Sequence, residues 1–273
     1  DEAIARLLVD GQTSAITAVA SAVPALVAAA QAAVALLSSG NGRIIYVGAG
    51  SSGLIAALDG MELAGTFGWP ETRTLFILAN GHVLEPGLPG GAEDDGERGR
   101  AEMVLHDPSP ADVVIAVAAS GRTPFTLAAT AAAREAGALT VGLAPLLARV
   151  DVPVLIGTGP EVISGSTRMG AGTAQKAALG ILSTMIMTRL GRIHDGLMVD
   201  LRIDNDKLRR RATGIVMHIA GCDEAAAVAA LAAAGDHVKS AVLVARGATP
   251  EQARRLLTAA ADNLRSALAL LEA

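Results

Sequence analysis

The sequence predicts an α/β protein: a doubly wound, five-stranded parallel sheet with helices before it and a small helical appendage after it. Three observations support this. Short runs that are apolar throughout, without alternation, recur between residues 44 and 156, and strands buried on both faces have this composition. Longer helical stretches separate the runs, which is the alternation of βαβ units. Beyond about Asp200 the strand-like runs stop.

The five strands are expected where Val, Ile and Leu cluster between turn-forming residues. They are Ile44–Val47, Thr74–Leu78, Val113–Ala118, Thr140–Ala144 and Val152–Ile156. The helices between and after them are expected at about Ser52–Leu63, Ala92–Leu105, Thr123–Ala136 and Gly170–Leu190. Thr123-Pro124 is typical of a helix start, because a capping residue is followed by a proline whose missing N–H costs nothing there.

Both ends of the chain are expected to be helical. A first helix over Asp1–Val9 is followed by an Ala-rich helical run that stops at the Gly/Asn cluster of residues 40–42. After Asp200 the expected helices are Asp204–Ile219, Asp223–Ala233, His237–Ala245 and Thr249–Leu271. We therefore divide the chain into an α/β domain over residues 1–200 and a helical region over residues 201–273.

Composition excludes several classes of protein. Of the 273 residues 51% are hydrophobic and 18% are charged, which is too apolar for a disordered chain. The single cysteine, Cys222, excludes a disulfide framework and fits a reducing cytoplasm. A net charge of −5 gives no basic footprint for nucleic acid. The uncharged stretch from Gly11 to Asn41 is Ala-rich and contains Pro24, so we expect a buried or interface helix there and no membrane span.

Open parallel sheets bind ligands at the carboxyl ends of their strands, so the residues after each strand are the candidates for a site. The first strand is followed by Gly48-Ala49-Gly50-Ser51-Ser52-Gly53, which formally matches the dinucleotide fingerprint. That fingerprint needs an acidic residue at the end of the second strand, where Leu78-Ala79-Asn80-Gly81 stands. We favour a phosphate cradle of N–H groups and serine hydroxyls, with a nucleotide cofactor and a tight turn that binds nothing as the alternatives.

Two more hydroxyl-rich turns follow the third and fifth strands, at Ala119–Pro124 and Ser164–Lys176. Neither contains the Gly-Lys-Ser/Thr ending of a triphosphate-binding loop. Neutral donors of this kind suit a monophosphate and sugar hydroxyls, although Thr123 taken alone is better explained as a helix cap. The candidate binding residues from the three turns are Gly50, Ser51, Ser52, Ser120, Gly121, Thr123, Ser164, Ser166 and Thr167.

Together these motifs resemble the N-acetylmuramic acid 6-phosphate etherase family of the sugar-isomerase (SIS) domain superfamily, to which glucokinase regulatory protein also belongs. The resemblance rests on Gly48–Gly53, Ala119–Pro124, Gly159–Lys176 and Gly196–Asp200, and it covers essentially the whole chain. It implies a SIS-type sugar-phosphate domain over residues 1–200, cleavage of a lactyl ether to N-acetylglucosamine 6-phosphate and lactate, no metal or organic cofactor, and a cytoplasmic homodimer.

The resemblance also implies a catalytic pair of glutamates. Met61-Glu62-Leu63 precedes Thr66-Phe67-Gly68, and Glu93 follows 31 residues after Glu62, the family's separation. Glu62 would protonate the departing lactate, Glu93 would remove the proton at C2, and Glu161 would bind sugar hydroxyls. The helix around Glu62 is largely apolar, and burial there would make its carboxyl hold a proton more tightly, as an acid requires. Without the family resemblance, Glu62 and Glu93 would each be interpreted as an ordinary surface glutamate.

The chain departs from the family's pattern at Leu54, Asn80, His82 and Gly170, which leaves a related sugar phosphate open as the substrate. Two other functions fit the same motifs. A regulator that binds sugar phosphates would keep the serines and would not need both glutamates. An aldose–ketose isomerase would also move a C2 proton but would release nothing. The five histidines show no metal-ligand spacing, so we expect no metal.

Overall fold

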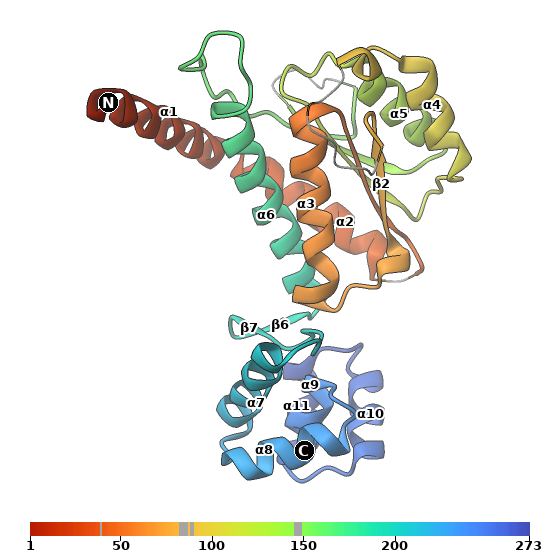
Figure 1. Ribbon diagram of the computed structural model, residues 1–273. Coiled ribbons are helices and arrows are strands. Elements are labelled where there is room, and N and C mark those ends of the chain that lie inside the picture. The colour runs from red at the N-terminus through yellow and green to blue at the C-terminus, as the bar shows by residue number, and fades with distance from the viewer. Residues whose placement is uncertain (39, 82–86, 88–89, 145–148) are drawn as a thin grey trace. The chain divides into compact units, whose positions relative to one another are not determined.

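The computed structural model describes residues 1–38, 40–81, 87, 90–144 and 149–273 (Figure 1). The chain forms two compact units. Unit 1 consists of Asp1–Met61 and Glu71–Ile186, and unit 2 consists of Glu62–Pro70 and Met187–Ala273. The expected domain boundary at residue 200 falls inside unit 2, because the segments 62–70 and 187–200 pack with the C-terminal helices.

Unit 1 contains a five-stranded parallel sheet in the order β2-β1-β3-β4-β5, which confirms the predicted fold class. The strands are β1 Ile44–Gly48, β2 Thr74–Leu78, β3 Val113–Val117, β4 Leu139–Leu143 and β5 Val152–Val154. β1 pairs with β2 on one side and with β3 on the other, so the strand order reverses at β1. Ligands bind in the crevice that such a reversal opens at the carboxyl ends of the strands.

Helices cover both faces of this sheet (Figure 1). On one face α4 (Gly96–Leu105) and α5 (Pro124–Glu135) pack side by side, and Phe125 of α5 joins Ile45 and Val47 of β1 in one apolar cluster. The other face carries α2 (Val23–Leu37), α3 (Gly50–Phe67) and α6 (Gly170–Arg189). There the hydroxyls of Tyr46 and of Ser183 in α6 both donate to the carboxylate of Asp59 in α3, at 2.8 and 3.1 Å.

The N-terminal helices break at a different residue from the one expected. α1 runs over Glu2–Ser21 and α2 over Val23–Leu37, so the predicted end at Val9 is wrong. Pro24 lies in the first turn of α2, where its missing N–H is tolerated, and it sets the break. Gly11 sits inside α1, and a Cβ there would lie 2.6 Å from Cγ2 of Val162, so this glycine permits close packing.

No single helix of the described residues is long and apolar enough to cross a bilayer. Two bent pairs, α1 with α2 and α7 (Asp206–Ala220) with α8 (Glu224–Ala233), reach the required length and composition when each pair is taken together.

Unit 2 contains a small hairpin and a helical bundle. The hairpin strands are β6 Ile193–His194 and β7 Leu197–Met198, which are too short to leave a pattern in the sequence. The bundle comprises α7 Asp206–Ala220, α8 Glu224–Ala233, α9 Val238–Ala245, α10 Pro250–Ala259 and α11 Leu264–Glu272. The single helix expected over Thr249–Leu271 is therefore wrong, because Ala261 and Asp262 adopt left-handed φ angles of 49° and 60° and break it.

A buried carboxylate at the start of β3 gives a pH-dependent prediction for unit 1. Asp112 is 2% exposed and accepts hydrogen bonds from the backbone N–H groups of Arg43 (2.8 Å) and Ser109 (2.9 Å) and from the Arg43 guanidinium (2.8 Å). Burial by itself would raise the pKa of Asp112, but these bonds hold the pKa below its ordinary value of 3.8. The ionised form is therefore favoured in the folded chain.

We expect Asp112→Asn to lower the free energy of unfolding by about 2 kcal/mol at pH 7, the scale of hydrogen bonds to a charged group. Because the folded pKa is depressed, this contribution is complete above pH 3.8 and is lost as the pH falls through the folded value. Urea unfolding followed by circular dichroism at several pH values measures it. A difference between the two proteins that stays constant down to pH 2 would contradict the assignment.

Candidate active site

A pocket of about 150 Å³ lies at the carboxyl ends of β1 and β3. It brings together the turn after β1, the turn after β3, the turn before α6 and the acidic segment before α4. The residues that line it are Ala49, Gly50, Ser51, Ser52, Glu93, Ala118, Ala119, Ser120, Thr123 and Thr167. Residues from all three predicted hydroxyl-rich turns therefore meet at one place, at the reversal in strand order.

The turn after β1 is built on three glycines. A Cβ on Gly48 would lie 2.7 Å from the Cα of Gly53, so the strand and the helix approach too closely for a side chain there. Gly50 begins α3 with a left-handed φ of 54°. This tight turn places Ser51 and Ser52 in the first turn of α3, where the backbone N–H groups have no acceptor within the helix. The arrangement offers amide and hydroxyl donors to an anion.

The turn after β3 makes a second set of donors. Gly121 has a φ of 69°, and the hydroxyl oxygen of Ser120 accepts from the N–H of Arg122 at 3.2 Å. Thr123 occupies the position that precedes α5, but within the described chain its side chain accepts no capping hydrogen bond from that helix. The interpretation of Thr123 as a simple helix cap is therefore not supported, and its side chain lines the pocket.

The turn before α6 contributes less than the sequence suggested. Thr167 lines the pocket, whereas Ser164 and Ser166 are not among the described residues that line it. Gly121, in the turn after β3, is not among them either. The carboxylate of Glu161 accepts the N–H groups of Gly170 and Ala171, each at 2.9 Å, and so caps the first turn of α6. The structure thus gives Glu161 a local role, and its contact with a sugar stays a prediction.

Glu93 is the one acidic residue among the described residues that line the pocket. It ends a short 3-10 helix, Gly90–Glu93, and its carboxylate lies against Gly50, so that a Cβ at residue 50 would overlap its Oε1 atom. Gly50 is therefore needed twice, for its positive φ and for the room it leaves to the carboxylate. The side chains of Ser51 and Ser52 follow directly in α3, so hydroxyls and a carboxylate face one cavity.

Glu62 does not line this pocket in the described chain. It lies in the same helix as Gly50, twelve residues later, which is a rise of about 18 Å along α3. Its side chain is exposed, as are those of Leu58 and Met61, at 43% and 63% exposure. The expected burial of Glu62 is therefore wrong for the single chain. His82, another candidate near the second strand, lies outside the described residues.

Sequence reasoning missed three residues that line the pocket: Ala49, Ala118 and Ala119. Alanine has no reactive group and so gave no chemical signal, although its place directly after a strand could have indicated it. No group of three or more His, Cys, Asp or Glu side chains in the described ranges could hold a metal ion.

Comparison with known proteins decides the family. The N-acetylmuramic acid 6-phosphate etherase of Deinococcus radiodurans is 47% identical to this chain, over 98% of the chain and 89% of the relative. That of Cutibacterium acnes is 43% identical, over 93% of the chain and 85% of the relative. The chain belongs to the N-acetylmuramic acid 6-phosphate etherase family. In this etherase-family chain the glutamates at residues 62 and 93 lie well inside the matched region.

The other comparisons add less to the etherase family assignment. No protein-family model matches the chain. Among solved structures, a protein of E. coli CFT073 in complex with A5P has a TM-score of 0.49 and 16% identity, over 69% of this chain and 92% of that chain. A phosphoheptose isomerase from Francisella tularensis has a TM-score of 0.44 and 18% identity, over 64% of this chain and 94% of that chain.

Proposed function

We propose that this chain cleaves the lactyl ether of N-acetylmuramic acid 6-phosphate to give N-acetylglucosamine 6-phosphate and lactate. One observation supports this beyond family membership. A carboxylate, that of Glu93, lies inside a pocket whose other polar groups are hydroxyls and amides suited to an anion. A negative charge there weakens phosphate binding, because like charges repel. Its presence is explained if it removes a proton from the bound sugar.

The proposed reaction follows from these groups. The hydroxyls of Ser51, Ser52 and Ser120 and the nearby amides hold the phosphate of an open-chain sugar, whose C1 aldehyde acidifies the proton at C2. Glu93 removes that proton, and the C–H electron pair forms the C2–C3 double bond as the C3–O bond breaks. Glu62 gives its proton to the departing lactate oxygen. Water then adds its oxygen to C3 and gives one proton to the Glu62 carboxylate, while Glu93 returns its proton to C2, so both glutamates regain their starting forms.

The test is incubation of the chain with N-acetylmuramic acid 6-phosphate, with lactate and the sugar product measured separately. We expect one lactate for each N-acetylglucosamine 6-phosphate formed. Binding of sugar phosphates without turnover would overturn the proposal and support a regulator. A ketose product formed without lactate would overturn it and support an isomerase.

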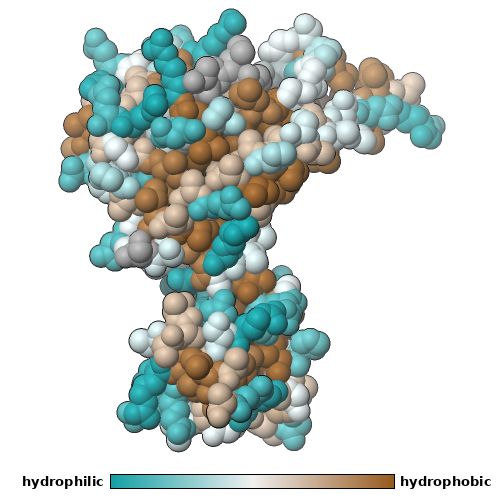
Figure 2. Space-filling model, turned by 180° about the vertical axis from the view of Figure 1, so that it is seen from behind, coloured by the Kyte–Doolittle hydropathy of each residue, from teal (hydrophilic) through white to brown (hydrophobic). Residues whose placement is uncertain are grey.

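We also propose a homodimer in which Glu62 of the partner subunit reaches the pocket. A hexose phosphate is shorter than the rise of about 18 Å that separates Gly50 from Glu62 in α3. Leu58, Met61 and Glu62 share one exposed face of that helix by their spacing, so a partner that covered the two apolar side chains would also cover the glutamate. Helix α1 exposes further apolar residues, including Ile4 and Leu7. Figure 2 shows that hydrophobic side chains reach the surface of the chain in several places.

Co-expression of Glu62→Gln and Glu93→Gln chains tests this arrangement. Each variant alone is expected to keep only a residual activity, about a thousandth of that of the wild type. If the two glutamates of one site come from different chains, half of the dimers formed at random are mixed and each mixed dimer has one intact site, so the mixture recovers about a quarter of wild-type activity. A mixture that keeps only this residual activity, or a mass in solution that corresponds to one chain, would contradict the proposal.

The cytoplasm is the compartment that we propose for this activity, because a charged sugar phosphate does not cross a bilayer without a transporter. Cell fractionation with an antibody to the chain tests this location.

A further inference from the structure

The end of α3, just after Glu62, is held by a segment of unit 2 that is remote in sequence. The backbone N–H of Arg202 donates to the carbonyl oxygen of Gly65 at 3.3 Å. Nη1 of Arg192 donates to the carbonyl oxygens of Gly68 and Phe67, at 3.2 and 3.5 Å. These are the last carbonyls of α3 and of the turn after it, and no N–H group of the helix donates to them. Residues 192–202 therefore fix the end of the helix that carries Glu62.

Glycine at residue 68 makes this contact close. Gly68 has a left-handed φ of 59°, and a Cβ there would overlap the carbonyl oxygen of Asp200 and lie 3.3 Å from its Cβ. The turn after α3 thus packs directly on the backbone of Asp200. Its position is set by that residue as well as by the guanidinium of Arg192.

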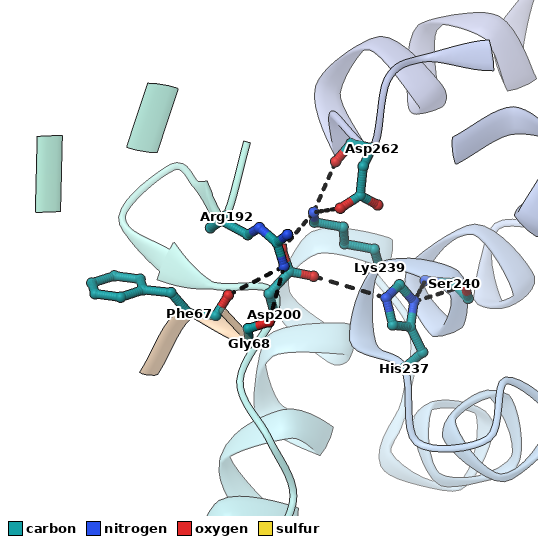
Figure 3. Close-up of polar contacts among 8 residues, drawn as sticks. All are labelled: Phe67, Gly68, Arg192, Asp200, His237, Lys239, Ser240 and Asp262. Carbon is teal, nitrogen blue, oxygen red and sulfur yellow. Dashed lines mark hydrogen bonds and ion pairs between the residues drawn. The ribbon is translucent and has the colours of Figure 1, made fainter. Parts of the chain in front are cut away.

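Asp200 is in turn tied to the helical bundle through a buried lysine (Figure 3). Nζ of Lys239 in α9 lies 2.6 Å from the carboxylate of Asp200, and it also donates to the carboxylate and the carbonyl oxygen of Asp262, both at 2.8 Å. Lys239 is fully buried and Asp200 is 8% exposed. Nη1 of Arg192 lies 3.6 Å from the same carboxylate, and Nε2 of His237 lies 3.8 Å from it. Arg192 thereby joins the bundle to the end of α3.

Stability alone is a poor explanation for such a cluster. Burying a lysine and a carboxylate costs desolvation energy that their attraction often only balances, and apolar residues of similar size stabilise a core at least as well. What the ionic groups add is direction, because each hydrogen bond fixes an angle as well as a distance. In this cluster hydrogen bonds join Lys239 to the α10–α11 connection and Arg192 to the last carbonyls of α3, and the ion pairs with Asp200 connect the two sets.

We propose that Arg192 is a positioning residue, through which the helical bundle of unit 2 fixes the end of α3 and so the carboxylate of Glu62. The inference rests on the proposed function, in which Glu62 is the acid. It gives the C-terminal helices a role in the reaction, although their own described residues do not line the pocket.

Arg192→Met tests this, because it cuts the link to α3 and leaves the Lys239 ion pairs in place. We expect kcat for lactate release to fall about tenfold with KM unchanged, since a small misplacement of a catalytic group slows the reaction without weakening binding. Arg192→Lys should recover part of the loss. In a Glu62→Gln background, Arg192→Met should have no further effect, because both changes act through the same group. Arg209→Met is the matched control, since Arg209 forms an exposed ion pair with Asp236 in the same unit.

Amide hydrogen exchange provides a readout that does not depend on turnover. In Arg192→Met the amides of residues 62–70 should exchange faster, while those of α7 to α11 stay as in the wild type. Unchanged exchange at residues 62–70, an equal loss of kcat in Arg209→Met, or a further loss in the Glu62→Gln background would each overturn the inference. If the wild type releases no lactate, the proposed function fails, and the exchange result still shows whether Arg192 holds the end of α3.

Discussion

Glu93→Gln is expected to lower kcat for lactate release by about a thousandfold, the scale on which a positioned general base contributes. The amide of glutamine cannot accept the C2 proton. The carboxylate that it replaces, that of Glu93, is the one acidic side chain among the described residues that line the pocket. Binding of N-acetylglucosamine 6-phosphate should be kept or slightly strengthened, because the hydroxyls and amides remain and a like charge has been removed. Calorimetry and a coupled lactate assay measure the two effects separately.

Glu97→Gln is the matched control, because it removes the same charge four residues away, in the exposed first turn of α4. It should leave kcat within twofold of the wild type, as exposed substitutions generally do. In deuterated water, Glu93→Gln should also lose exchange of the C2 proton, while Glu62→Gln should keep that exchange and lose only lactate release. A Glu93→Gln chain that exchanges the C2 proton at the normal rate would rule out the assigned base.

Lys239→Met is expected to produce the largest loss of stability in unit 2, about 4 kcal/mol, because removing one partner of a buried ion pair leaves the other uncompensated. Here the carboxylates of Asp200 and Asp262 both lose the ammonium group of Lys239, and Asp200 keeps only the longer contacts with Arg192 and His237. Trp69, the only tryptophan of the chain, belongs to unit 2 and is 2% exposed, so its fluorescence reports the unfolding of this unit in urea.

Two further variants show whether the loss comes from the unpaired charge. Arg209→Met breaks an exposed ion pair in the same unit and should cost less than 1 kcal/mol, about the value of surface pairs. Adding Asp200→Asn to Lys239→Met should restore part of the stability, since the buried charge left alone is removed. A Lys239→Met chain as stable as the Arg209→Met control would mean that the buried lysine contributes nothing.

The sheet was predictable because an uninterrupted apolar run directly reports burial on both faces, as in Val113–Val117. Helix starts were predictable where a cap or proline marks them, as at Pro124 and Pro250. The break between α10 and α11 was not predictable, because Ala261 and Asp262 adopt left-handed conformations that usually require glycine. Nothing in an alanine-rich stretch marks such a residue; the surrounding contacts impose it.

The candidate site was predictable to the extent that it depends on strand ends. The turns containing Ser51 and Ser120 had to meet, because the strands before them are neighbours in the sheet. The role of Glu93 was implied only by the family resemblance, and its approach to Gly50 was not predicted, since long-range packing sets it. The burial of Glu62 was predicted wrongly, because the apolar composition of a helix does not show which of its faces is packed against the rest of the same chain. Leu58 and Met61 are apolar and yet exposed.

The three helix starts around the pocket also give the bound sugar a polarity. The first turn of α6 is already occupied by the carboxylate of Glu161, and that of Glu93 lies against the first residue of α3. The start of α5 has neither a carboxylate in its first turn nor a side-chain cap from Thr123 in the described chain. We therefore expect the phosphate to lie toward the start of α5, in the part of the pocket that Ser120 shares with Ser51 and Ser52, and the aldehyde end of the sugar to lie beside Glu93.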